Sequence, residues 1–105
     1  MASRDVVMDA ARRLAEAAPP ASRVILFGSH ARGHASAESD LDFLVVERDL
    51  EDRWAEWSRL REAVAGVPAA FDLFVASEAE VELWANVRGT VLHEAVTHGT
   101  VVNGG

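Results

Sequence analysis

A spacing of three to four residues between apolar positions marks four helical segments along the chain. The spacing predicts helices over residues 3–17, about 51–65 and roughly 90–98, and a further helix that starts at Ser77 and breaks near Gly89. In the first of these segments, four apolar residues fall on one helical face: Val7, Ala10, Ala11 and Leu14. A helix with one apolar face needs a partner surface to cover it.

Apolar runs between these helices predict the strands of a sheet. They cover residues 24–27, 40–47 and 71–75, and a short closing strand is expected over 100–102. Within the second strand, residues 41–46 are apolar on both faces, except for one acid. A strand that is apolar on both faces is covered on both sides, so we expect this strand to be central in the sheet.

Capping and breaking residues predict where the helices begin and end. Ser3, Asp49 and Ser77 each precede a helical segment and carry a side-chain oxygen that can accept a hydrogen bond from the first turn. Pro20 stops the first helix, and Gly66 ends the second.

The order of elements predicts the fold class. The expected order is helix, strand, a short helix over 30–32, strand, helix, strand, two helices and a last short strand. This order indicates an α/β (α+β) fold, with helices packed against a small mixed sheet. Trp54, Trp57 and Trp84 occupy apolar helical positions, so we expect them in the core. The alternative is a hydrophobic docking surface, since Trp is enriched at interfaces.

Length, composition and charge narrow the class of protein. The 105 residues, half of them apolar, predict a single domain spanning 1–105. The absence of cysteine excludes disulfides, thiolate zinc sites and cysteine nucleophiles. A net charge of -7 argues against extended nucleic-acid binding, which relies on Lys and Arg. No segment approaches the roughly 20 apolar residues of a membrane helix, and the N-terminus is unlike a signal peptide, so we expect a cytoplasmic protein.

Two acids at the start of the predicted central strand are the first candidates for chemistry. Asp40 and Asp42 are two residues apart, so on a strand their side chains project from one face. Adjacent carboxylates repel each other unless a proton or a cation lies between them. Hard divalent ions such as Mg²⁺ prefer oxygen ligands of this kind, so the pair predicts a metal site.

The turn before this strand and one acid after it extend the candidate site. Gly28 and Ser29 follow an apolar strand and offer backbone N–H groups to a phosphate, and Arg32 can add positive charge there. Asp72 lies in the next apolar strand. If that strand neighbours the first, its carboxylate joins Asp40 and Asp42, and the three could hold two Mg²⁺ ions for displacement at a phosphorus atom.

Each feature also has an ordinary structural explanation. Asp-x-Asp pairs occur by chance, a Gly-Ser pair after a strand is usually a plain turn, Asp72 could be a solvated edge residue, and Arg32 could lie on the surface. The histidines of the chain are interpreted as exposed or structural: His30, His34, His93 and His98. The order of the features along the chain, rather than any one of them, favours a nucleotide site.

At these residues the chain resembles a known family. Gly-Ser-His-Ala-Arg-Gly over 28–33, followed by Ser-Asp-Leu-Asp over 39–42, is similar to the signature of the minimal nucleotidyltransferases of the DNA polymerase beta-like superfamily. Asp72 matches the third acid of that signature, and the helix and short strand after residue 90 resemble the family's ending. The resemblance covers nearly the whole chain.

The resemblance implies an activity and a partner. It implies Mg²⁺-dependent transfer of AMP from ATP to an acceptor hydroxyl, with Asp40, Asp42 and Asp72 as catalytic metal ligands and Gly28, Ser29 and Arg32 on the nucleotide. It also implies a small helical HEPN-type toxin as partner, which the transferase neutralises by adenylylation or by binding. Because the larger relatives carry a substrate domain after the catalytic core, we expect the acceptor here to be another protein.

Two other functions stay open at this point. One is a binding-only antitoxin that covers its partner, and the other is a transferase acting on a small molecule or a nucleic acid. The sequence leaves the acceptor, the nucleotide preference and the oligomeric state undetermined.

Overall fold

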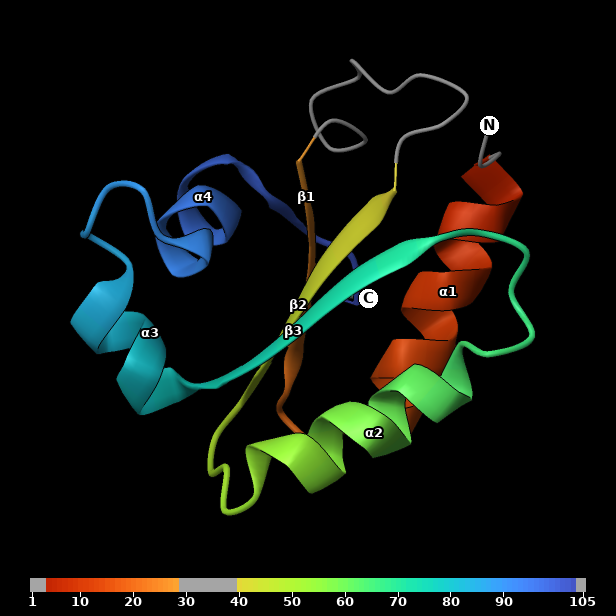
Figure 1. The fold of residues 1–105 in the computed structure, drawn as a ribbon, viewed down its shortest axis with the longest axis horizontal. Coiled ribbons are helices and arrows are strands. Elements are labelled where there is room, and N and C mark those ends of the chain that lie inside the picture. Colours follow the sequence, from red (N-terminus) through yellow and green to blue (C-terminus); the bar gives the residue numbers. More distant parts are fainter. Residues whose placement is uncertain (1–3, 29–39, 104–105) are drawn as a thin grey trace.

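A four-stranded mixed sheet forms the centre of the protein in the computed structural model, which describes residues 4–28 and 40–103 (Figure 1). The strands are β1 (Arg23–Phe27), β2 (Leu41–Glu47), β3 (Phe71–Ser77) and β4 (Thr100–Val101). Their order is β3-β2-β1-β4, with β1 antiparallel to β2 and β4, and β3 parallel to β2. The small mixed sheet expected from the sequence is confirmed, and β2 lies inside it.

Helices cover both faces of this sheet. As Figure 1 shows, α1 (Arg4–Ala17) and α2 (Arg53–Ala63) lie on one side, and α3 (Glu78–Trp84) and α4 (Val91–His98) lie on the other. Alternate residues of β2 pack into two separate clusters, one with α1 and α2 and the other with α3 and α4. This double burial is what the apolar pattern of the strand predicts. None of the helices described is long and apolar enough to cross a bilayer.

The helix ends follow capping chemistry, with one correction. Ser77 forms the expected capping box with Glu80, and the Thr90 hydroxyl accepts from the backbone N–H of His93 at the start of α4. The prediction of Asp49 as the cap of α2 is wrong, because the cap is Asp52, whose carboxylate accepts from Ala55 at 3.1 Å. The helix begins at Arg53, two residues later than the sequence suggested. Ser3 lies outside the described residues.

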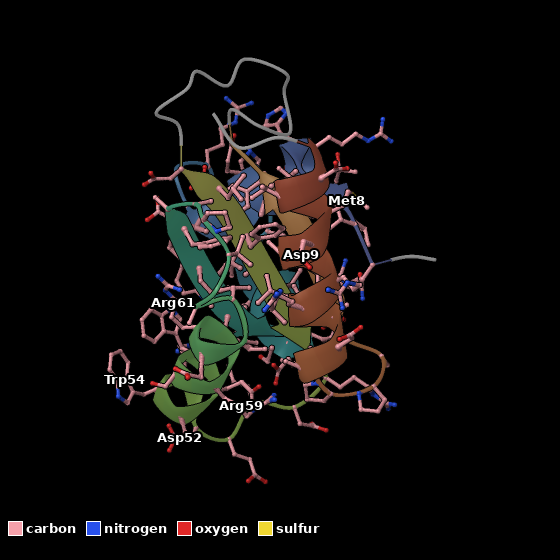
Figure 2. All side chains as sticks on the ribbon, turned by 90° about the vertical axis from the view of Figure 1, so that its right-hand side faces the viewer. Met8, Asp9, Asp52, Trp54, Arg59 and Arg61 are labelled. Atoms are coloured by element: carbon pink, nitrogen blue, oxygen red, sulfur yellow. The ribbon has the colours of Figure 1, made fainter. Side chains whose placement is uncertain are left out.

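The prediction that all three tryptophans lie in the core is also wrong. Trp54 is 73% exposed and Trp84 is 46% exposed, while Trp57 is half-buried. Figure 2 shows Trp54 projecting outward from the first turn of α2. Its ring stacks on that of Trp57, with centroids 5.1 Å apart and an interplanar angle of 12°. The two rings border a cavity of about 390 Å³ beside strand β3.

Two side chains of α2 form hydrogen bonds with backbone carbonyls of β3, which is an edge strand of the sheet. The indole Nε1 of Trp57 donates to the Leu73 carbonyl at 2.8 Å, and Nε of Arg53 donates to the Val75 carbonyl at 3.2 Å. An edge strand with free carbonyls invites pairing with another chain. These two bonds satisfy the carbonyls they reach and fasten α2 to the strand that carries Asp72.

The last residue of β2, Glu47, carries a buried carboxyl group. Glu47 is only 2% exposed, and its Oε2 atom has no hydrogen-bond partner among the described residues. Burial, together with the nearby carboxylate of Glu56, raises the pKa of Glu47 from 4.5 to about 7, while the positive charge of Arg59 opposes the rise. The folded protein therefore holds a proton at Glu47 more tightly than the unfolded chain does.

This raised pKa predicts a pH dependence of stability. Between about pH 4.5 and 7 the folded state binds more protons than the unfolded state, so the free energy of unfolding should fall as the pH rises and should level off above 7. Glu47→Gln stays neutral and should be more stable than the parent at pH 8, by up to about 3 kcal/mol, with little difference at pH 4.5. Urea unfolding at both pH values measures this, with Glu82→Gln on the exposed side of α3 as the control. An equal effect of Glu47→Gln at the two pH values would contradict the assignment.

Candidate active site

The parallel register of β2 and β3 brings two of the predicted acids together. Asp42 and Asp72 are direct partners in this ladder, so their side chains project from the same face at a strand spacing of about 4.8 Å. The face is that of α3 and α4, because Leu44 and Phe74, two residues further along each strand, pack into that cluster. Asp42 is half-buried and Asp72 is exposed. A ligand can therefore reach the pair from the solvent at Asp72, whereas Asp42 lies closer to the core.

Asp40 stands directly before β2 and is exposed. The start of the strand is fixed by a hydrogen bond of 2.9 Å from the backbone N–H of Leu41 to the carbonyl of Ala70, next to β3. Within the described part of the chain, no group of three or more acids and histidines is arranged to hold a metal ion. The structure therefore brings Asp42 and Asp72 together, and the participation of Asp40 stays a prediction.

Gly28 lies against the carboxylate of Asp42. Its φ angle is +75°, a conformation that favours glycine, and a Cβ atom placed on it would lie 2.1 Å from Oδ2 of Asp42. The end of β1 and the start of β2 meet here, since Phe27 is the ladder partner of Asp42. The turn can approach the acid this closely only because residue 28 has no side chain.

The rest of the predicted phosphate turn lies outside the described residues. This applies to Ser29 and Arg32 and also to the short helix expected over residues 30–32. Their proposed contacts with a nucleotide therefore stay predictions.

The residues that are described fit a hard cation and a phosphate. Asp42 and Asp72 supply oxygen ligands only, which is the donor set that Mg²⁺ prefers. Two like charges side by side are destabilising in a sheet, so a function that uses both of them explains why they are adjacent. Gly28 lets the backbone of the turn lie against the Asp42 carboxylate, where a Cβ atom would collide with Oδ2.

Sequence reasoning missed the surroundings of His93. The residue is half-buried, its ring Nδ1 lies 2.8 Å from the carbonyl of Ala85, and it lines a cavity with Phe27. The sequence spacing of the histidines carries no signal of this arrangement, because Phe27 and His93 come together only when α4 packs on β1.

Comparison with protein families gives a match over most of the chain. The model of a family described as a nucleotidyltransferase domain matches residues 7–93. The matched region includes Gly28, Asp40, Asp42 and Asp72. A comparison with curated protein sequences gives no match.

Several solved structures share this fold. A chain in a crystal structure of a toxin–antitoxin complex with AMP-PNP has a TM-score of 0.56 at 24% identity, covering 93% of this chain and 70% of the neighbour. A chain in a mutant of the MntA–HpeT toxin–antitoxin complex has a TM-score of 0.60 at 23% identity, with coverages of 95% and 71%. A chain from a tri-AMPylated Shewanella oneidensis HEPN toxin in complex with MNT antitoxin has a TM-score of 0.51 at 21% identity, with coverages of 95% and 71%.

Identities this low establish a common fold and nothing finer. The family match is broader evidence, because it extends from α1 into α4 and contains the turn and all three acids. On that basis, the chain belongs to the nucleotidyltransferase domain family.

Proposed function

We propose that this protein transfers AMP from ATP, in a Mg²⁺-dependent reaction, to a hydroxyl group on a HEPN-type partner protein, and that it acts as the antitoxin of that partner. The observation that carries the proposal is the pair Asp42 and Asp72 on adjacent strands, with Gly28 packed against Asp42. A nucleotidyl transfer needs carboxylates of this kind beside a turn that a phosphate can approach. Because ATP is the donor, the compartment we propose is the cytoplasm.

Each site residue has a role in this proposal. Asp40, Asp42 and Asp72 would hold two Mg²⁺ ions. When bound, the ions would supply positive charge to the phosphoryl group in transfer. Gly28 lets the backbone approach the triphosphate, and Ser29 and Arg32 bind its oxygens.

The transfer itself forms one bond and breaks another. The acceptor oxygen bonds to the α-phosphorus of ATP, and the bond from that phosphorus to the bridging oxygen breaks. The acceptor proton passes to the carboxylate of Asp72, which is exposed and therefore accessible to a hydroxyl presented from outside. Pyrophosphate leaves with the electrons of the broken bond.

The structural neighbours support the choice of nucleotide and acceptor. One of them is a toxin–antitoxin complex with AMP-PNP, and another contains a tri-AMPylated HEPN toxin with its MNT antitoxin. A protein acceptor on a helical partner is therefore the form of the reaction that we propose for this chain.

A binding-only antitoxin is the second candidate, favoured by one observation. Trp54 exposes 73% of its surface beside a cavity of about 390 Å³. Large exposed aromatic residues of this kind are common in the centres of protein interfaces. Such a surface could neutralise a partner without any chemistry at the carboxylates.

A single assay separates the two candidates. The full chain is incubated with Mg²⁺, ATP labelled at the α-phosphate and a candidate HEPN-type partner protein, and mass spectrometry locates the label. We expect AMP on a hydroxyl side chain of the partner and loss of the partner's toxicity. A variant with asparagine at positions 40, 42 and 72 should neither label nor neutralise the partner. Neutralisation by that variant would favour binding alone, and label on a small molecule or nucleic acid instead of the partner would reject the protein acceptor.

A further inference from the structure

A groove of about 390 Å³ lies between β3, an edge strand of the sheet, and the first two turns of α2. It is lined by Arg53, Trp54, Trp57, Leu73, Phe74 and Val75, and is called the Trp54 groove below. Trp54 exposes 73% of its surface, and Figure 2 shows it projecting away from the helix. An exposed aromatic ring beside an apolar groove marks an interaction surface. No role in the proposed transfer has been given to the groove so far.

The two tryptophan rings of the groove are ordered before any partner binds. The ring of Trp54 stacks on that of Trp57, with centroids 5.1 Å apart and an interplanar angle of 12°. The Trp57 ring is itself fixed, because its Nε1 atom donates to the carbonyl of Leu73 at 2.8 Å. A side chain that is already ordered loses less conformational entropy when a partner covers it. The groove is therefore a preformed binding surface.

The backbone of β3 indicates how a partner would contact the groove. The carbonyls of Leu73 and Val75 accept hydrogen bonds from Trp57 and Arg53 of α2. An added strand needs such edge carbonyls as acceptors, so these two bonds disfavour recognition by strand addition. An apolar groove is instead suited to a helix that inserts side chains from one of its faces. The groove therefore fits a helical partner.

The groove is continuous with the proposed active site. Asp72 directly precedes Leu73 on β3 and is exposed. Phe74, two residues after Asp72, lies on the same face of the strand, about 7 Å further along it. A protein that covers the groove at Phe74 therefore has Asp72 within reach of its side chains. In the proposed transfer Asp72 accepts the proton of the acceptor hydroxyl, so the acceptor protein has to contact this part of β3.

We propose that the Trp54 groove docks a helix of the acceptor protein and so brings the acceptor hydroxyl to Asp72. The proposal rests on the proposed function. It gives the groove a part in the transfer, whereas the binding-only candidate uses the same surface without any chemistry. Trp54 is a positioning residue in this proposal, because it contacts the acceptor protein and not the reacting atoms.

The charges beside the groove define the chemistry of the docking helix. The guanidinium of Arg53 is paired with the carboxylate of Glu80. Glu51 and Asp52, directly before Arg53 in the chain, are exposed acids, and the whole chain carries a net charge of -7. Complementary charge increases the rate and the specificity of association. The docking helix should therefore carry apolar side chains for the groove and Lys or Arg at its border.

Two measurements on the full chain with a candidate HEPN-type partner protein test the proposal. Calorimetry without nucleotide gives the affinity for the partner, and transfer of label from ATP labelled at the α-phosphate, at varied partner concentration, gives KM and kcat. Trp54→Ala should weaken the affinity by about 10- to 100-fold and raise KM by a similar factor, because it removes the ring that fills the interface. The value of kcat and the affinity for Mg²⁺–ATP should stay unchanged, since the reacting groups are intact.

Trp84→Ala is the matched control, because Trp84 is also exposed, at 46%, but lies on α3 and not in the groove. Its affinity and KM for the partner should equal those of the parent. Glu51→Arg is a second test that leaves the lining of the groove intact. It should weaken partner binding by about 3-fold at low salt and by less at high salt. Glu82→Arg, the same change in net charge at an exposed position of α3, should leave the affinity unchanged.

The possible outcomes separate the docking surface from the transfer. An unchanged affinity and KM in Trp54→Ala, or an equal loss in Trp54→Ala and Trp84→Ala, would overturn the docking proposal, and continued labelling of the partner would leave the proposed function standing. Should Trp54→Ala fail to fold, equal affinities of Glu51→Arg and Glu82→Arg would overturn the docking proposal instead. If the parent binds the partner without labelling it, the proposed transfer fails, and the affinities of the variants still decide the docking surface. If the parent does not bind the partner at all, both proposals fail.

Discussion

Replacing Asp42 with asparagine should abolish nucleotidyl transfer in a protein that remains folded. Asp42 and Asp72 are neighbours on adjacent strands, and the proposed metal ions need the negative charge of both. Asparagine keeps the shape of the side chain but removes its charge, so we expect a loss of at least about 1,000-fold in rate, or about 4 kcal/mol in activation free energy. Transfer of label from ATP labelled at the α-phosphate measures the effect.

The stability of the same variant distinguishes lost chemistry from lost structure. Two like charges directly opposite each other destabilise a sheet, so removal of one should leave the melting temperature unchanged or slightly higher. Asp49→Asn, an exposed acid in the connection between β2 and α2, is the matched control and should retain full activity. Undiminished transfer by Asp42→Asn would reject the assignment of the site. A large loss of stability would indicate a structural role for the carboxylate.

The sequence was sufficient to predict the central strand and the acids on it. The apolar run of 41–46 predicted a strand that is buried on both faces. Because side chains alternate between the faces of a strand, Asp40 and Asp42 were expected to project from the same face. The position of Asp42 beside Asp72 was a conditional prediction, because an apolar pattern does not determine which strands are neighbours. The structure supplies that missing fact through the parallel register of β2 and β3.

The errors arose where tertiary packing decides the outcome. Helical spacing assigned Trp54 to the apolar face of its helix, but spacing does not say which part of that face the sheet covers. Leu60 is fully buried in the core, whereas Trp54, in the first turn of α2, is 73% exposed beside the edge strand β3.

The burial of Glu47 is a further feature that the neighbouring sequence does not predict. An acid at the end of a strand is usually solvated, and nothing near it in the chain indicates otherwise. In the folded protein Pro19, in the connection to β1, and Glu56, on α2, line the same cavity of about 370 Å³ as Glu47. A raised pKa at such a position follows only from the three-dimensional arrangement.

Substitution of Gly28 by alanine should lower the stability of the protein for two separable reasons. The φ angle of +75° is unfavourable for alanine by about 1–2 kcal/mol, and the new Cβ would lie 2.1 Å from Oδ2 of Asp42. Gly89→Ala isolates the first effect, since Gly89 has a φ of +86° and no atom lies within 4 Å of the position that an alanine methyl group would take there. Gly28→Ala should therefore lower the free energy of unfolding by more than Gly89→Ala does.

A double-mutant cycle with Asp42→Ala isolates the second effect. If the collision with the carboxylate causes the excess loss, Gly28→Ala should cost no more than Gly89→Ala once that carboxylate is gone, giving a coupling free energy of about 1–3 kcal/mol. Urea unfolding of the four proteins measures the coupling. A coupling near zero would mean that the turn and the acid are not in contact. A clear coupling would show that the glycine is needed to keep the backbone against Asp42, where the proposed triphosphate has to bind.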